Sequence, residues 1–172
     1  TEIILKEMIE SLSMDLFEKH LVTNKLVLTI GYDIENMKDY RGEIMEDRYG
    51  RKLPKHLHGT INLDRYTSSY KLMCDALLRF YHLHINHALT IRRIQLNATQ
   101  VRSDDIPVTY KQLSLFDEEK IEVDLSKEKK LQSVTLDIKK KYGKNALLKG
   151  TDLQEGATTL SLIHISEPTR RS

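Results

Sequence analysis

Residues 112–116 form the segment of this sequence best suited to dock into another protein. Gln112 leads a short run that ends in two apolar side chains, Leu115 and Phe116, within an otherwise acidic stretch. A glutamine can hydrogen-bond at the rim of a pocket while two apolar anchors enter it. The predicted docking peptide consists of Gln112, Leu113, Ser114, Leu115 and Phe116. A strand, or a simple apolar contact with the protein's own domain, is the alternative.

Basic and hydroxyl-bearing side chains supply a second candidate site, which would contact phosphates. Arg92 and Arg93 are adjacent in a predicted strand, so their side chains would point to opposite faces unless a bulge intervenes. Lysines, arginines and the amides of a helix N-terminus contact a nucleic-acid backbone regardless of base sequence. The candidates are Arg92, Arg93, Arg65, Lys71, the segment from Lys52 to His58, and Ser68 at the start of a predicted helix. A solvated charged surface without a ligand is the alternative.

No residue pattern in the sequence predicts catalysis or metal binding. His82, His84 and His87 do not share one helix face, since residues two positions apart diverge. The single cysteine, Cys74, excludes a disulfide framework and a zinc-binding thiolate cluster. A glycine-rich phosphate loop and a nucleophile elbow are also absent. We therefore predict no catalytic residues, no metal ligands and no cofactor in this chain.

Length and charge limit the class of protein. The 172 residues carry 27 Lys and Arg against 25 Asp and Glu, a net charge of +2. This balance does not by itself indicate nucleic-acid binding, and the length suits one compact domain plus a tail. No apolar run approaches the ~20 residues of a membrane span, and the N-terminus has no signal-peptide layout. We expect a cytoplasmic protein without a membrane partner.

Hydrophobic periodicity predicts an α+β fold for residues 1–102. The expected elements are a helix over 2–21, strands over 25–32, 58–66 and 89–98, and a helix opened by Thr67 to Ser69. Residues 33–57 lack a period and are predicted to be a long charged loop. Two helices backing a small antiparallel sheet of three to four strands form an α+β sandwich. Because such units usually begin with a strand, we expect the first strand to be missing.

The composition changes after residue 102. Residues 103–124 are acidic and are predicted to be a flexible linker that carries the docking peptide. Residues 125–159 form a Lys-rich tail, whose helix over 126–142 aligns Leu131, Val134, Ile138 and Tyr142. We expect residues 160–172 to be non-native read-through.

Several segments, in this order, resemble a known family. They are HGTINLDRYTSSYKL, LTIRRIQLNA, QLSLF and LDIKKKYGKNALLKGTDLQEGAT. Over residues 1–159 the chain resembles the C-terminal part of Y-family lesion-bypass DNA polymerases of the UmuC-like branch. The resemblance implies that residues 1–102 are a little-finger domain. In that family, a four-stranded sheet backed by two helices lies in the major groove of the template–primer duplex.

The resemblance also assigns roles to residues. It implies that Arg92 and Arg93 contact DNA, that Thr60, Arg65 and Ser68 lie near its backbone, and that residues 112–116 bind the bacterial replicative sliding clamp. The family's palm, with its Mg²⁺-binding carboxylates, has no counterpart in the chain. We therefore expect a monomeric, noncatalytic fragment, cut at both ends, that acts on damaged DNA in translesion synthesis and repair. Its expected location is the bacterial cytoplasm, at the nucleoid when it is on DNA.

Two other interpretations stay open. One is a free-standing DNA- or clamp-binding adaptor without polymerase activity. The other is an RNA-binding sheet module, which is weakened because the central strands offer no aromatic pair for base stacking.

Overall fold

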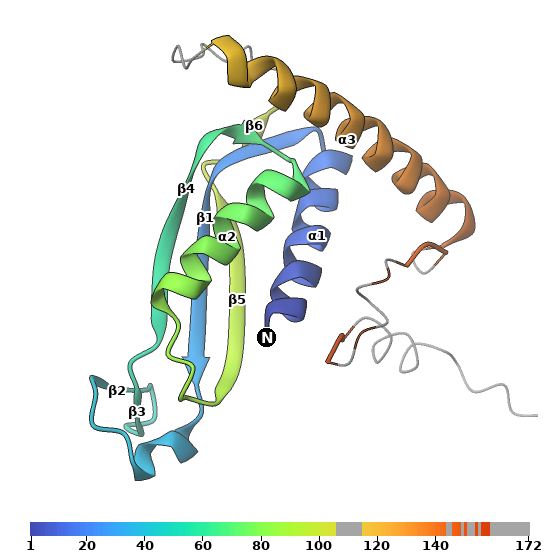
Figure 1. The fold of residues 1–172 in the computed structure, drawn as a ribbon. Coiled ribbons are helices and arrows are strands. Elements are labelled where there is room, and N and C mark those ends of the chain that lie inside the picture. Colours follow the sequence, from blue (N-terminus) through green and yellow to red (C-terminus); the bar gives the residue numbers. More distant parts are fainter. Residues whose placement is uncertain (106–114, 144–145, 149, 151–153, 155, 159–172) are drawn as a thin grey trace, which may run out of the picture. The chain divides into compact units, whose positions relative to one another are not determined.

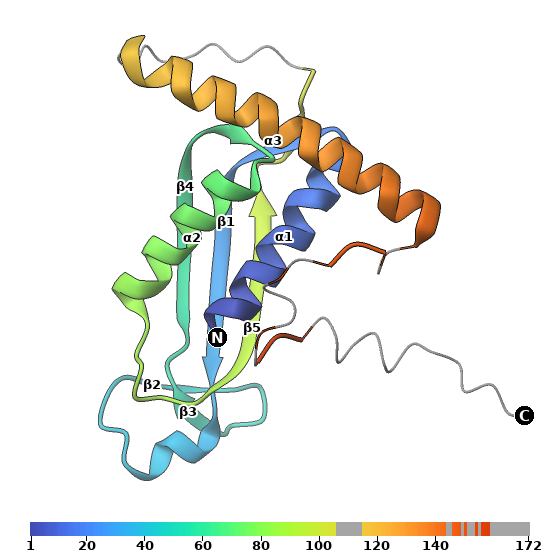
Figure 2. The same ribbon diagram turned by 45° about the vertical axis from the view of Figure 1, so that its right-hand side comes forward.

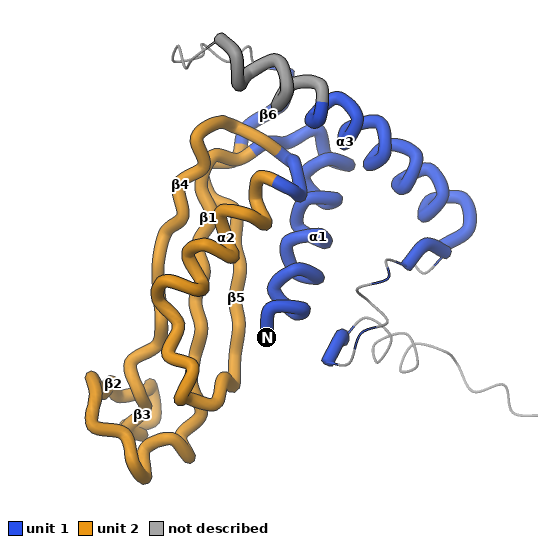
Figure 3. Tube along the Cα trace, in the orientation of Figure 1, with its two compact units in different colours: residues 1–22, 68–71, 102–172 blue, residues 23–67, 72–101 orange. Residues whose placement is uncertain are grey.

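A computed structural model describes residues 1–105, 115–143, 146–148, 150, 154 and 156–158. Its elements in chain order are α1 (Glu2–Glu18), β1 (Leu21–Tyr32), the 3₁₀ helix η1 (Ile34–Lys38), β2 (Ile44–Glu46), β3 (Lys52–Pro54), β4 (Leu57–Thr67), α2 (Tyr70–His84), β5 (Ile91–Thr99), β6 (Arg102–Ser103) and α3 (Leu115–Tyr142) (Figure 1). These elements divide into two compact units (Figure 3). The sheet unit comprises residues 23–67 and 72–101, and the helical unit comprises residues 1–22, 68–71 and 102–172.

The strands confirm the predicted α+β class. β4, β1 and β5 form an antiparallel sheet in that order, with β1 at the centre. β6 pairs with Leu21 and Val22 at the start of β1, which makes a four-stranded sheet. β2 and β3 form a separate two-stranded antiparallel sheet.

Alternation along β1 gives the sheet one apolar face. Leu26, Leu28 and Ile30 are fully buried, and the side chains between them point to the opposite face. On α2, Met73 and Leu77 are fully buried at a helical spacing of four residues. Burial of each such side chain stabilises the fold by about 1.5–3 kcal/mol. Figures 1 and 2 show α2 lying across one face of the sheet. The exposed side chains of the other face include those of Thr60, Asn62, Gln95 and Asn97.

Residues 33–57 contain more structure than the predicted loop. Asp33 caps the start of η1, and its side chain accepts a hydrogen bond from the amide of Glu35 at 3.0 Å. Asn36 holds this helix to the start of β5, since its side chain bonds both the amide and the carbonyl of Thr90, at 2.9 and 3.0 Å. The prediction of a long charged loop missed these short elements because local polar side chains, rather than a hydrophobic period, stabilise the segment.

The helical unit contains α1, β6 and α3. Ser13 of α1 is fully buried, and Gln132 of α3 is only 7% exposed. The Nε2 atom of Gln132 donates to the hydroxyl oxygen of Ser13 at 2.9 Å. At the end of α1, Glu18 forms an ion pair with Lys140 of α3, with Nζ and Oε1 3.2 Å apart. Side-chain polar contacts therefore join the two helices.

α3 begins at Leu115, well before the predicted start at residue 126. The sequence places three consecutive acidic residues, 117–119, near the start of this helix. Negative charge at a helix N-terminus stabilises the helix, which a linker prediction based on composition overlooks. None of the helices in the described part of the chain has the length and apolar character needed to cross a membrane.

Candidate nucleic-acid interface

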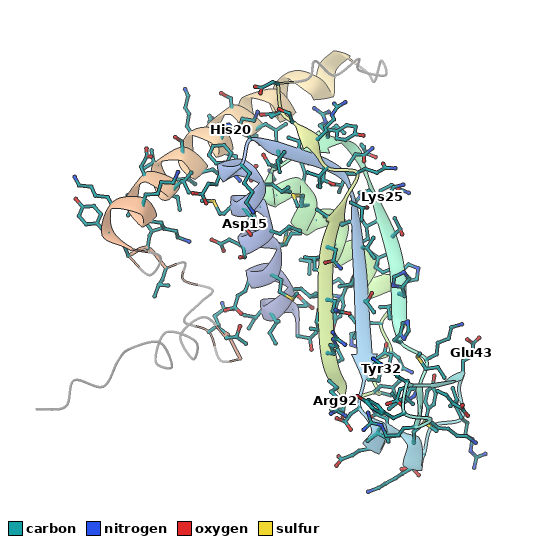
Figure 4. All side chains as sticks on the ribbon, turned by 180° about the vertical axis from the view of Figure 1, so that it is seen from behind. Asp15, His20, Lys25, Tyr32, Glu43 and Arg92 are labelled. Atoms are coloured by element: carbon teal, nitrogen blue, oxygen red, sulfur yellow. The ribbon has the colours of Figure 1, made fainter. Side chains whose placement is uncertain are left out.

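The face of the sheet opposite α2 carries polar side chains in cross-strand rows. From β4 through β1 to β5, these rows are Asn62, Lys25 and Thr99; Thr60, Val27 and Asn97; and His58, Thr29 and Gln95. We call this surface, together with Arg92 and Arg93, the open sheet face. Figure 4 looks onto it, with α2 behind the sheet and with Lys25 and Arg92 toward its two ends. Hydroxyl, amide and cationic groups of this kind are donors to phosphate oxygens.

A β-bulge decides where the two adjacent arginines lie. Tyr32 of β1 pairs with Ile91, but the preceding Gly31 pairs with Arg93, so the β5 strand has one extra residue, Arg92, at this point. Ile91 thus falls opposite the buried Tyr32, while Arg93 joins the open sheet face beside Gly31. Arg92 stands between them, and both arginines are exposed. The sequence allowed for a bulge at this pair, and the structure contains one. With it, the side chains of both arginines are exposed to solvent.

A side-chain hydrogen bond on the open sheet face links β1 to β4. The Oγ1 atom of Thr29 lies 2.8 Å from Nδ1 of His58 in the neighbouring strand. This contact holds the imidazole against the neighbouring strand. The face therefore combines a pre-positioned ring with rows of exposed amide and hydroxyl groups.

Two further predicted residues, Lys52 and Arg65, are not part of these cross-strand rows. Lys52 is exposed on β3, in the two-stranded sheet, opposite Glu46. Arg65 is partly buried and lies between Asn62 and Thr67 of β4, where the register with β1 shifts. Of the eight predicted DNA contacts, the sheet brings together His58, Thr60, Arg92 and Arg93.

Ser68 and Lys71 belong to the helical unit, where the start of α2 is already occupied by a carboxylate. Glu128 of α3 accepts from the hydroxyl of Ser69 at 2.5 Å and from the amide of Lys71 at 3.1 Å. Ser68 is 4% exposed, and its carbonyl oxygen accepts a hydrogen bond from Ser13 at 2.7 Å. At this helix N-terminus, the amide of Lys71 is therefore already paired with a carboxylate of the protein itself.

Ion pairs neutralise two cations around the two-stranded sheet. The hydrogen bond and charge of Lys55 lower the pKa of Glu43, and the same contact raises the pKa of Lys55. A side-chain hydrogen bond from Arg51 lowers the pKa of Asp47, with the two side chains 2.7 Å apart. Because these pairs are exposed, they contribute little to stability. They do reduce the positive charge that this region could offer to a phosphate.

The predicted docking peptide lies mostly outside the described residues. Gln112, Leu113 and Ser114 are not among them, and the side chains of Leu115 and Phe116 are not described. The backbone of the last two residues forms the first turn of α3. An extended docking conformation would therefore require this terminal turn to unwind, and helix ends open at little cost.

Sequence reasoning missed the neutral members of the open sheet face. Asn62, Gln95 and Asn97 are exposed, and each alternates with residues of the inward-facing series. The signal was present in the sequence, since polar residues occupy every second position over residues 58–64 and 93–97. The predicted phosphate contacts were mostly Lys and Arg, although neutral hydrogen-bond donors contact phosphates as well.

Other kinds of site have less support in the described residues. A cavity of about 230 Å³ lies beside Tyr32, His56 and His84, and it is smaller than the ~300–1,000 Å³ of typical small-molecule sites. The described part of the chain contains no group of three or more His, Cys, Asp or Glu side chains that could hold a metal ion.

No protein-family model matches the chain, and no curated protein sequence is significantly similar to it.

Proposed function

We propose that this chain binds duplex DNA through the open sheet face, as the little-finger part of a Y-family translesion DNA polymerase. The observation that carries the proposal is the β5 bulge, which exposes Arg92 and Arg93 beside rows of hydroxyl and amide groups. Cations would supply the affinity, and the neutral donors would fix the position of the backbone. Such contacts read no base sequence, which suits a protein that must follow any template.

The composition of this face favours duplex DNA over single-stranded RNA. Sheet modules that bind single strands stack bases on aromatic side chains of their central strands. The rows of the open sheet face contain one imidazole, His58, but no Phe, Tyr or Trp. Backbone contact with a duplex therefore fits these residues better than base stacking does.

Replacing both bulge arginines tests the proposal. The Arg92→Ala/Arg93→Ala variant should bind duplex DNA more weakly, whatever the sequence of the duplex. If each arginine neutralises one phosphate, the slope of log K against log salt should become shallower by about two. The measurement is fluorescence anisotropy of a labelled duplex over a series of salt concentrations, with a single-stranded RNA of equal length in parallel.

Arg79→Ala is the control, and it is compared with the single variant Arg93→Ala, which removes the same charge. Arg79 is an exposed arginine on α2, which lies on the other face of the sheet. Its loss should leave both the affinity and the salt slope nearly unchanged. Equal effects of the two changes would mean that binding follows overall charge and that the open sheet face is not the site.

The wider role that we propose is that of a noncatalytic C-terminal fragment, in which residues 112–116 dock on the replicative sliding clamp. A tether of this kind raises the effective concentration of a weak DNA-binding domain at a primer end. The resemblance in sequence and the polar sheet face support this role. The clamp contact is tested separately, as described in the Discussion.

A further inference from the structure

α3 is held in the helical unit by the polar side of the helix. Gln132 is buried against Ser13, and its Nε2 also donates to the carbonyl of Ser68 at 3.2 Å. Glu128 bonds the start of α2, and Lys129 pairs with Asp104 at 3.0 Å. These contacts fix which side of α3 faces its own unit.

The same contacts leave an apolar side of α3 in solvent. Leu131 is 67% exposed, Val134 is 55% exposed and Tyr142 is 68% exposed, while Ile138 is partly buried. The spacing of three, four and four residues puts these side chains on one stripe. Periodicity in the sequence aligns the same four residues. The stripe has the width of a coiled-coil seam, which is narrower than the apolar face of a helix packed on a domain. We call it the α3 seam.

Lysines border the α3 seam at both ends. Lys127 lies one helical turn before Leu131, and Lys141 lies beside Tyr142, with its Nζ 5.3 Å from the centre of that ring. Lys130 is exposed next to Leu131. A second copy of α3 packed along the seam would bring Lys127 against either Lys127 or Lys141, depending on the orientation of the two helices. Like charges at such positions oppose pairing, whereas acidic residues would favour it.

We propose that the α3 seam binds an acidic amphipathic helix of another protein. Its apolar positions would fill the seam along Leu131, Val134 and Ile138, and its Glu or Asp side chains would pair with the flanking lysines. A narrow seam matches the contact surface of one helix, whereas adsorption to a lipid bilayer requires a broad apolar face. On α3, the buried polar contacts of Gln132 and Glu128 occupy the neighbouring positions and prevent such a face.

The experiment uses the full chain and two synthetic helical peptides, each about three heptads long with leucine at the core positions. One peptide carries glutamate at the flanking positions, and the other carries lysine there. The acidic peptide should bind at least tenfold more tightly in a fluorescence anisotropy titration. The Leu131→Ser/Val134→Ser variant should lose at least tenfold in affinity, with a circular dichroism spectrum like that of the unaltered chain.

A charge exchange separates the seam from general electrostatic attraction. The Lys127→Glu/Lys141→Glu variant should now prefer the basic peptide. The control, Lys19→Glu/Lys38→Glu, makes the same change in net charge at exposed lysines outside α3 and should keep the original preference. Equal behaviour of the two charge variants would overturn the proposal.

Two further measurements address other occupants of the seam. Self-association of the unaltered chain that depends on Leu131, or binding of anionic vesicles with the same dependence and no peptide binding, would overturn the proposal in favour of a second copy or a lipid surface. The Arg92→Ala/Arg93→Ala variant should bind the acidic peptide normally, because the α3 seam is independent of the proposed DNA contact.

Discussion

Gly59 shows how a single missing side chain sets the fit between helix and sheet. A Cβ atom at this position would lie within 2.8 Å of Cε2 of the Phe80 ring, and closer still to its Cζ. The ring is held in turn by His84, which stacks on it with 4.2 Å between ring centres. The absence of a side chain at Gly59 therefore lets α2 approach β4 closely.

We expect Gly59→Ala to destabilise the protein by about 1–3 kcal/mol, because overpacking forces the ring or the helix to move. Urea denaturation followed by circular dichroism measures the change. Adding Phe80→Leu should recover part of the loss, since a shorter side chain leaves room for the new methyl group.

Gly31→Ala serves as the control for this prediction. A Cβ there would meet the Cβ of Arg93 at 3.6 Å, an ordinary contact distance, on the open sheet face. Its effect on stability should stay within about 1 kcal/mol. A loss as large as that of Gly59→Ala would show that the glycines matter for backbone conformation rather than for the space beside Phe80.

At the scale of elements, α3 acts as part of the cap of α2. Glu128 accepts hydrogen bonds from Ser69 and from the amide of Lys71, so one helix satisfies donors at the N-terminus of another. The Nζ atom of Lys71 also lies 3.6 Å from Asp124, one turn earlier on α3. The first turn of α2 thus depends on a helix far away in the sequence.

Glu128→Ala should cost about 1 kcal/mol, as the loss of a helix cap commonly does. Amide hydrogen exchange of the first turn of α2 should become faster, because the amide of Lys71 loses its acceptor. Asp137→Ala removes an exposed acidic residue from the same helix and should leave this exchange unchanged. Equal protection of the Lys71 amide in both variants would contradict the capping role.

At the scale of the whole molecule, the proposed function depends on two separate contacts. The open sheet face belongs to the sheet unit, whereas the docking peptide immediately precedes and enters α3. A weak DNA contact and a weak clamp contact on one chain combine through effective concentration. Each contact can therefore be removed without the other.

The Leu115→Ala/Phe116→Ala variant should lose binding to the bacterial sliding clamp by at least tenfold, because two apolar anchors supply most of the affinity of such a peptide. Surface plasmon resonance on immobilised clamp measures this, and duplex DNA binding should remain unchanged. Leu147→Ala/Leu148→Ala removes two other exposed apolar residues and is the control. Clamp binding that survives in the first variant, or that is absent from the unaltered chain, would exclude the docking peptide.

The sequence by itself determined the class and order of the main elements. Apolar side chains alternate along residues 26–30, and they recur at helical spacing in α1 and α2, so local periodicity indicated the strands and helices. It also predicted that Arg92 and Arg93 lie in a strand, with their side chains on opposite faces unless a bulge intervenes. These features follow from patterns within a few consecutive residues, where side-chain direction repeats with a fixed period.

Only the tertiary structure decided the features that depend on distant residues. The bulge at Arg92 is a matter of register between β1 and β5, which a single strand does not encode. The contact of Gln132 with Ser13 joins residues 119 positions apart and turns α3 so that Leu131 faces solvent. Periodicity identifies an apolar stripe but not the side of a helix that packs. That side is chosen by the partners that the chain brings to it, here buried hydroxyls and a helix N-terminus that form hydrogen bonds with polar side chains of α3.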